Sequence, residues 1–192
     1  MILYMEIAVV ILTGGKSTRM GMDKAKLVIE NQTFLERICD EFKEYPYRYI
    51  SDCKNGNHSI DGYRTIWDEY ENIGPMNGII SFFHQVNMDV VFVTSCDMPY
   101  MKKEIVEKLY AYLNEYDGVF VKENDHLHPL GGIYTRKMVE RIEQQIMNKK
   151  YSLYTCIKNS NVCILDIDAI KIDKKMYLNI NNREIYEDTI KG

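Results

Sequence analysis

The sequence predicts one three-layer α/β domain spanning residues 1–192, in which helices cover both faces of a mostly parallel sheet. Apolar and β-branched runs alternate with segments of helical periodicity from one end of the chain to the other, which is the pattern of strand–helix–strand units. With 192 residues, 46% of them hydrophobic, the chain is long enough for one well-packed core and short for two. No repeat, low-complexity segment or linker divides the sequence.

The N-terminal half contains signals for three strands and two helices. Residues 7–12 are continuously apolar, which is typical of a strand buried on both faces of a sheet. Pro75 suits the first position of a helix. The stretch of residues 52–62, rich in Asn, Gly and Asp, is expected to form a surface loop. Strands are predicted at residues 7–12, 47–51 and 63–67, and helices at residues 33–45 and 75–85.

The C-terminal half contains the strongest strand signal of the chain. Residues 90–94 are Val-Val-Phe-Val-Thr, a β-branched and aromatic run typical of a central strand. Residues 125–134 combine two histidines, a proline and paired glycines, and we expect them to form a functional loop. The remaining predicted elements are helices at residues 102–116 and 135–148, strands at residues 118–121 and 161–167, and a short helix after residues 178–181.

The composition argues against several classes of function. A net charge of −4 is unsuited to general electrostatic binding of nucleic acid or of an anionic membrane. The five cysteines are widely spaced and form no C-x-x-C pair, so neither a disulfide framework nor a structural zinc site is expected. The N-terminal apolar run is too short to span a bilayer and lacks the features of a secretory leader. We expect a cytoplasmic protein.

The stretch from residue 12 to residue 26 is the candidate phosphate site. Gly14 and Gly15 follow the first predicted strand and allow backbone N–H groups to approach an anion without an intervening side chain. Four basic residues and a single acid accompany them, a balance that suits a polyphosphate ligand. The basic residues are Lys16, Arg19, Lys24 and Lys26.

Two better-known phosphate motifs do not fit this stretch. Gly15-Lys16-Ser17 resembles the end of a Walker A loop, but Val10 stands where that motif requires a glycine. The dinucleotide-binding fingerprint lacks its third glycine. A solvated glycine-rich loop with incidental lysines is the structural alternative to a phosphate site.

Asp97 is the strongest candidate for a catalytic carboxylate. It lies three residues past the predicted strand 90–94, and ligands of open α/β sheets gather beyond the carboxyl ends of strands. A Mg²⁺ ion that bridges substrate phosphates needs only one or two protein carboxylates, whereas the alternative for Asp97 is a helix cap or turn. Asp68 is a weaker candidate, because Glu69 and Glu71 make a solvated acidic turn an equal alternative.

Two further groups have simpler explanations than catalysis. His126 and His128 would share one face of an extended segment, but no third metal ligand follows from the spacing. Hydrogen bonding is therefore favoured over metal ligation for both histidines. Cys96 has no evident base partner and is interpreted as an inert, small apolar residue.

Five segments together carry a resemblance to a known family. They are residues 12–24, 74–79, 96–100, 128–130 and 179–181. Across these segments the chain resembles the molybdenum cofactor guanylyltransferases, and the paired glycines favour guanylyl over cytidylyl transfer. Thr13 stands where that family normally has Ala, and Met76-Asn77 departs from its Leu-Ala. Residues 52–54 match poorly, at a place where the family often has an asparagine that touches the nucleotide.

The resemblance implies a fold, a reaction and a metal. The implied fold is the Rossmann-like, GT-A-like fold of nucleotide-diphospho-sugar transferases. The implied reaction is transfer of GMP from GTP to molybdopterin, with or without bound molybdenum, with release of pyrophosphate and with Mg²⁺ as cofactor. Molybdoenzyme maturation proteins are further candidate partners, and neither nucleic acid nor a membrane is expected as one.

The resemblance also implies roles for individual residues. The implied catalytic residues are Arg19, Lys24 and Asp97, of which Asp97 is also the metal ligand. The implied nucleotide-binding residues are Leu12, Thr13, Gly14, Gly15, Lys24, Asp68, Gly78 and Asp97. The implied acceptor-binding residues are His128, Asn179 and Asn181.

Two alternatives remain open at this point. The phosphate machinery does not identify the base, so a related transferase that uses CTP or another nucleotide fits the same residues, with molybdopterin or a sugar or polyol phosphate as acceptor. A non-catalytic nucleotide-binding module would keep the site without turnover. Charge aimed at a reacting phosphorus favours the enzyme over the binding module.

Overall fold

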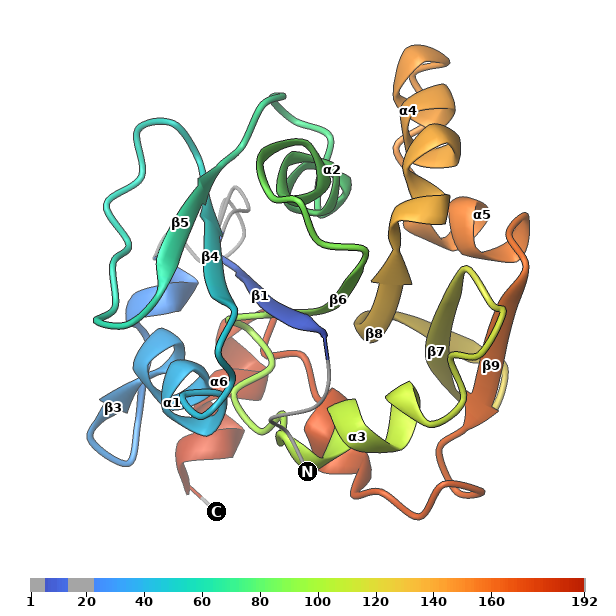
Figure 1. The fold of residues 1–192 in the computed structure, drawn as a ribbon. Coiled ribbons are helices and arrows are strands. Elements are labelled where there is room, and N and C mark those ends of the chain that lie inside the picture. The colour runs from blue at the N-terminus through green and yellow to red at the C-terminus, as the bar shows by residue number, and fades with distance from the viewer. Residues whose placement is uncertain (1–5, 14–22, 192) are drawn as a thin grey trace.

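The computed structural model describes residues 6–13 and 23–191. Its centre is a seven-stranded sheet in the order β5-β4-β1-β6-β8-β7-β9 (Figure 1). The strands are β1 (Ala8–Leu12), β4 (Arg48–Asp52), β5 (Arg64–Trp67), β6 (Val90–Ser95), β7 (Gly118–Glu123), β8 (His126–Thr135) and β9 (Val162–Asp166). A separate hairpin pairs β2 (Val28–Ile29) with β3 (Gln32–Thr33).

The sheet is mostly parallel, as predicted. Strands β5, β4, β1 and β6 are parallel neighbours, and β7 runs parallel to β9. Between these two groups, β8 runs antiparallel to β6 on one side and to β7 on the other. The carboxyl ends of β1, β4, β5 and β6 therefore lie at one edge of the sheet, where ligands of α/β folds bind.

Helices cover both faces of the sheet, which confirms the predicted three-layer fold (Figure 1). Alternate side chains of β1 enter different cores: Val9 and Ile11 pack on the side of α1 and α3, and Ala8 and Val10 on the side of α2, α4 and α5. The helices are α1 (Phe34–Glu41), α2 (Met76–Gln85), α3 (Glu104–Tyr110), α4 (Val139–Met147), α5 (Leu153–Lys158) and α6 (Arg183–Lys191).

Residues 125–134 do not form the predicted loop, because all but the first belong to strand β8. The register of β8 against β7 shifts, so that Val121 faces His128 while Val119 faces Ile133. Residues 129–132 therefore stand opposite one residue of β7 and form a bulge. The proline at position 129 cannot donate a ladder hydrogen bond, and the glycine at position 131 has a φ of +75°. These loop-like residues mark an irregular strand.

Several element boundaries differ from the predictions. Helix α1 begins with a capping box, in which Thr33 Oγ1 accepts the N–H of Glu36 at 3.1 Å and the Glu36 carboxylate accepts the N–H of Thr33 at 2.8 Å. Helix α3 is shorter than the predicted 102–116. The hairpin and α5 escape prediction because two-residue strands and a six-residue helix carry little periodicity.

Within residues 6–13 and 23–191, no helix has the length and hydropathy required to cross a bilayer.

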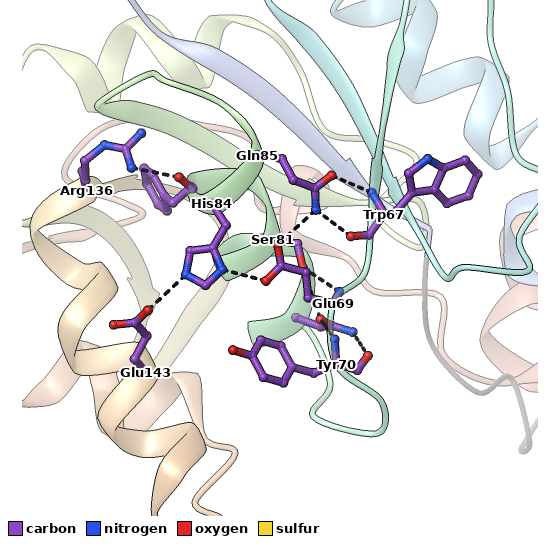
Figure 2. Close-up of polar contacts among 10 residues, drawn as sticks. Trp67, Glu69, Tyr70, Ser81, His84, Gln85, Arg136 and Glu143 are labelled. Carbon is purple, nitrogen blue, oxygen red and sulfur yellow. Dashed lines mark hydrogen bonds and ion pairs between the residues drawn. The ribbon is translucent and has the colours of Figure 1, made fainter.

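His84, in the last turn of α2, links two segments that are far apart in the sequence (Figure 2). Its Nδ1 lies 2.6 Å from Oε2 of Glu69, just after β5, and its Nε2 lies 3.1 Å from Oε1 of Glu143 in α4. Burial lowers the pKa of His84, but the hydrogen bonds to the two carboxylates together raise it by more, so the folded-state pKa lies above the ordinary 6.5. A charged ring donates to both carboxylates.

We expect His84→Gln to destabilise the fold in a pH-dependent way. Because the folded-state pKa of His84 is raised, the contribution of the charged ring is fully present below about pH 6.5 and is lost as the pH rises through the folded-state pKa. Thermal unfolding between about pH 5.5 and about pH 8.5 should show the largest gap between wild type and variant at the lowest pH. Lys150→Gln, at an exposed position, is the control. The same gap at every pH for His84→Gln would contradict the electrostatic link.

Candidate active site

A pocket of about 440 Å³ opens beside Asp97, two residues past the carboxyl end of β6. Four of the predicted site residues line it: Asp97, His128, Asn179 and Asn181. They come from the end of β6, from β8 and from the segment before α6, so the fold brings distant parts of the chain to one place. Another part of the wall, residues 152–154 at the start of α5, gave no signal in the sequence because that helix is too short to show a period.

Lys24 connects the phosphate-loop stretch to this pocket. Its ammonium group lies 2.9 Å from Oδ2 of Asp97 and donates to Oδ1 of Asn181 at 2.6 Å. The N–H of Ile180 donates to the carbonyl of Asp97 at 2.9 Å, which fixes the segment before α6 against the end of β6. Three of the predicted site residues therefore form one contact group.

Of the two carboxylate oxygens of Asp97, one has no hydrogen-bond partner among the described residues and is called here the spare oxygen. Oδ2 pairs with Lys24, whereas Oδ1 is buried and has no hydrogen-bond partner among the described residues. A buried charged oxygen without a partner costs free energy, so such an oxygen is suited to a cation or to a ligand donor. Within residues 6–13 and 23–191 there is no group of three His, Cys, Asp or Glu side chains able to hold a metal ion alone. A metal at Asp97 would thus take most of its ligands from substrate and water.

Four predicted nucleotide-side residues gather around Ser51 at the end of β4. The N–H and the hydroxyl of Thr13 donate to the carbonyl of Ser51 at 3.0 and 2.9 Å. The Ser51 hydroxyl donates to Oδ1 of Asp68 at 2.7 Å. A Cβ at Gly78 would lie 2.5 Å from both Ser51 Oγ and Leu12 Cδ2, so this close approach requires glycine. Burial raises the pKa of Asp68, and the hydrogen bond from Ser51 partly offsets the rise.

Side chains on one face of α2 hydrogen-bond to the backbone of residues 67, 69 and 70 (Figure 2). These residues lie on both sides of Asp68 in the sequence. Gln85 accepts the N–H of Trp67 at 3.2 Å and donates to its carbonyl at 2.7 Å. Asn77 accepts the N–H of Tyr70 at 3.0 Å and donates to its carbonyl. A side chain of α2 therefore satisfies both backbone groups of Trp67, at the end of β5, and another satisfies both backbone groups of Tyr70.

A third side chain of α2 bonds to the same segment, and Asn77, Ser81 and Gln85 together are called the α2 grip. Ser81 accepts the N–H of Glu69 at 3.0 Å, and residues 77, 81 and 85 follow one another at four-residue spacing along one helix face. Asn77 is one of the positions at which the chain departs from the family pattern. The departure therefore has a structural use, because it anchors the segment that carries Asp68.

His126 and His128 lie side by side, and within the described residues no third His, Cys, Asp or Glu joins them in a group able to hold a metal ion. Their ring centroids are 4.9 Å apart, and the His128 ring packs on Tyr177 at 4.7 Å. Burial lowers the pKa of His128, and His126 lowers it further, so the ring is neutral at neutral pH. Nε2 of His128 is buried without a hydrogen-bond partner among the described residues. Because this atom belongs to a pocket-lining residue, it is available to a ligand.

Cys96 behaves as an apolar residue. Burial raises the pKa of its thiol far above neutrality, and the charge of Asp97 raises it further. A protonated, buried thiol is a poor nucleophile, in agreement with the interpretation from the sequence. The predicted roles of Gly14, Gly15 and Arg19 fall on residues outside those that the structure describes.

Comparison with known proteins identifies the family. Residues 9–162 match the MobA-like NTP transferase domain. The chain belongs to this family. A Clostridium perfringens (strain ATCC 13124) protein named "Probable molybdenum cofactor guanylyltransferase" is 33% identical over 187 residues, 94% of this chain and 94% of its own. The molybdenum cofactor guanylyltransferase of Campylobacter jejuni (strain RM1221) is 32% identical over 191 residues, 95% of this chain and 94% of its own. The predicted enzyme class, a nucleotidyltransferase, is confirmed.

Solved structures confirm the predicted GT-A-like fold. Molybdopterin-guanine dinucleotide biosynthesis protein A from Archaeoglobus fulgidus matches with a TM-score of 0.82 over 96% of this chain and 97% of its own, at 19% identity. The 2-C-methyl-D-erythritol 4-phosphate cytidylyltransferase from Thermus thermophilus matches with a TM-score of 0.69 over 97% of this chain and 98% of its own, at 10% identity. At these identities the likeness shows the fold alone.

We expect Asn77→Ala to destabilise the chain by about 1–2 kcal/mol, because the substitution removes both hydrogen bonds to the backbone of Tyr70 from a buried position. Urea unfolding measures the change. Asn87→Ala, at an exposed position just after α2, is the matched control and should stay within about 0.5 kcal/mol of wild type. Equal effects of the two substitutions would show that the α2 grip contributes nothing to stability.

Proposed function

We propose that this chain transfers GMP from GTP to molybdopterin, with or without bound molybdenum, to form the guanine dinucleotide form of the molybdenum cofactor. The names of its relatives at 33% and 32% identity support this substrate pair. One observation carries the proposal: Asp97 lines the pocket, its Oδ2 pairs with Lys24, and its Oδ1 has no hydrogen-bond partner among the described residues. We assign the residues around Ser51 to the nucleotide, and His128, Asn179 and Asn181, which line the pocket, to the acceptor.

Asp97 fits the Mg²⁺ ion that such transferases use. Its buried, unpartnered Oδ1 is a hard oxygen ligand, and a single carboxylate suffices when phosphates and water supply the rest. When bound, Mg²⁺ screens the negative charge of the triphosphate and of the departing pyrophosphate. Lys24 holds the other oxygen of the same carboxylate and so keeps Oδ1 oriented.

The reaction requires position and charge more than covalent chemistry. The phosphate of molybdopterin attacks the α-phosphorus of GTP, a new P–O bond forms, and the bond to the bridging oxygen breaks as its electron pair leaves with pyrophosphate. Lys24 uses two of its three N–H donors on Asp97 and Asn181, which leaves the third for a phosphate oxygen. Backbone N–H groups of residues 13–15 and the guanidinium of Arg19 are proposed to neutralise the remaining charge.

The two substrates are proposed to enter from different sides. Asp68, fixed by Ser51 and by the α2 grip, supports the nucleoside end of GTP. Neutral His128 offers Nε2 to the acceptor, together with the side-chain amides of Asn179 and Asn181. The compartment we propose is the cytoplasm, and the net charge of −4 gives no reason to add nucleic acid or a membrane as a partner. Molybdoenzyme maturation proteins are the proposed recipients of the product.

We expect Asp97→Asn and Lys24→Ala each to lower GMP transfer about 10²- to 10³-fold, because Asp97→Asn removes the anionic ligand proposed for Mg²⁺ and Lys24→Ala removes a cation directed at the reacting phosphates. Pyrophosphate release with GTP, Mg²⁺ and molybdopterin measures the loss. Lys43→Ala, which removes an equal charge from an exposed surface pair, is the matched control and should keep wild-type activity. Near-wild-type transfer by a folded Asp97→Asn or Lys24→Ala variant would contradict the role proposed for that residue.

A further inference from the structure

Asp52, His58 and Asp23 form a chain of contacts beside the groups described above. Nδ1 of His58 lies 2.9 Å from Oδ2 of Asp52, and Nε2 of the same ring lies 2.9 Å from Oδ2 of Asp23. Only 13% of the His58 side chain is exposed. One imidazole therefore spans the distance between the end of β4 and the residue that precedes Lys24.

Asp52 is the fixed end of this chain of contacts. It is the last residue of β4, is 2% exposed, and accepts the N–H of Cys53 at 2.9 Å and that of His58 at 3.0 Å. The following segment wraps closely around the carboxylate, because a Cβ at Gly56 would lie only 2.0 Å from Asp52 Oδ2. With both oxygens engaged and no free space beside them, the carboxylate holds the ring in one place.

Asp23 is the end that needs support. It caps a 3₁₀ helix of only three residues, Lys24–Lys26, by accepting the N–H of Ala25 at 3.1 Å. So short a helix makes few hydrogen bonds of its own, so its position depends on contacts from outside. His58 supplies such a contact through the capping residue.

We propose that His58 is a positioning residue for Lys24. The ring ties the cap of the 3₁₀ helix to the rigid end of β4, and the helix in turn directs Lys24 to Asp97 and Asn181. The expected effect on turnover rests on the proposed function, whereas the tie, which is the contact of His58 with Asp52 and Asp23, does not. Residues 52–54, where the tie begins, are also where the sequence departs from the family pattern.

Hydrogen exchange tests the tie without any substrate. In His58→Ala, the amides of residues 25–27 should exchange at least about 10-fold faster than in wild type, while the amides of β1 and β6 keep their rates. Asn57→Ala, an exposed neighbour in the same segment, is the matched control and should leave all of these rates unchanged. If His58→Ala does not fold, His58→Gln replaces it, because glutamine offers only one donor group. Unchanged exchange at residues 25–27 in the folded variant would overturn the proposal.

A double-mutant cycle tests whether His58 acts through Lys24. His58→Ala should lower kcat for GMP transfer about 10- to 100-fold and change KM for GTP less than about 3-fold, because a misplaced group costs most in the transition state. In the Lys24→Ala background the same substitution should change kcat less than about 2-fold. Equal losses in both backgrounds would refute the positioning role. If the wild-type protein transfers no GMP, but His58→Ala still speeds exchange of the amides of residues 25–27, the proposed function is refuted and the link through His58 is supported.

Discussion

The ammonium group of Lys24 lies 2.9 Å from the carboxylate of Asp97, and only 21% and 16% of these two side chains are exposed. A charged pair withdrawn this far from water is favourable only with good geometry and additional hydrogen bonds. Asn181 supplies one of these bonds, and the backbone bond from Ile180 to Asp97 holds the segment in place. The pair thereby joins the phosphate-loop stretch, the end of β6 and the segment before α6. Two of these segments, the end of β6 and the segment before α6, contribute Asp97, Asn179 and Asn181 to the lining of the pocket.

The sheet topology explains why they meet at this place. The chain passes from β1 to β4 on one side of β1 and returns through β6 on the other, and ligands of open α/β sheets bind at the carboxyl ends of the strands where the strand order reverses in this way. Beside this edge, Ser51 holds Thr13 and Asp68 through hydrogen bonds, in the region that we propose for the nucleotide. The pocket that we propose for the acceptor is lined in part by the bulged strand β8 and by the start of α5.

Much of the fold and the central carboxylate follow from local patterns, because β1 is a continuous apolar run, β6 is mostly β-branched and aromatic, and Asp97 comes two residues after β6. Ser51 and His58 do not follow from such patterns. Ser51 acts through its carbonyl and through a hydroxyl whose partner is 17 residues away, and His58 lies in a stretch whose Asn and Gly content predicts a surface loop. Strand β8 was missed because Pro129 and Gly131 indicate a break, whereas the sheet accommodates them in a bulge. Long-range pairing decides each of these cases.

The most direct measurement of the central claim is mass analysis of the product formed when the protein receives molybdopterin, Mg²⁺ and an equimolar mixture of GTP, CTP, ATP and UTP. Transfer at the Lys24–Asp97 meeting point predicts one new species, with the mass of molybdopterin plus GMP less one water, and an equimolar amount of pyrophosphate. A cytidylyl product would contradict the proposed base. Binding of GTP with no new product and no pyrophosphate would contradict the account of this site as a transferase acting on molybdopterin.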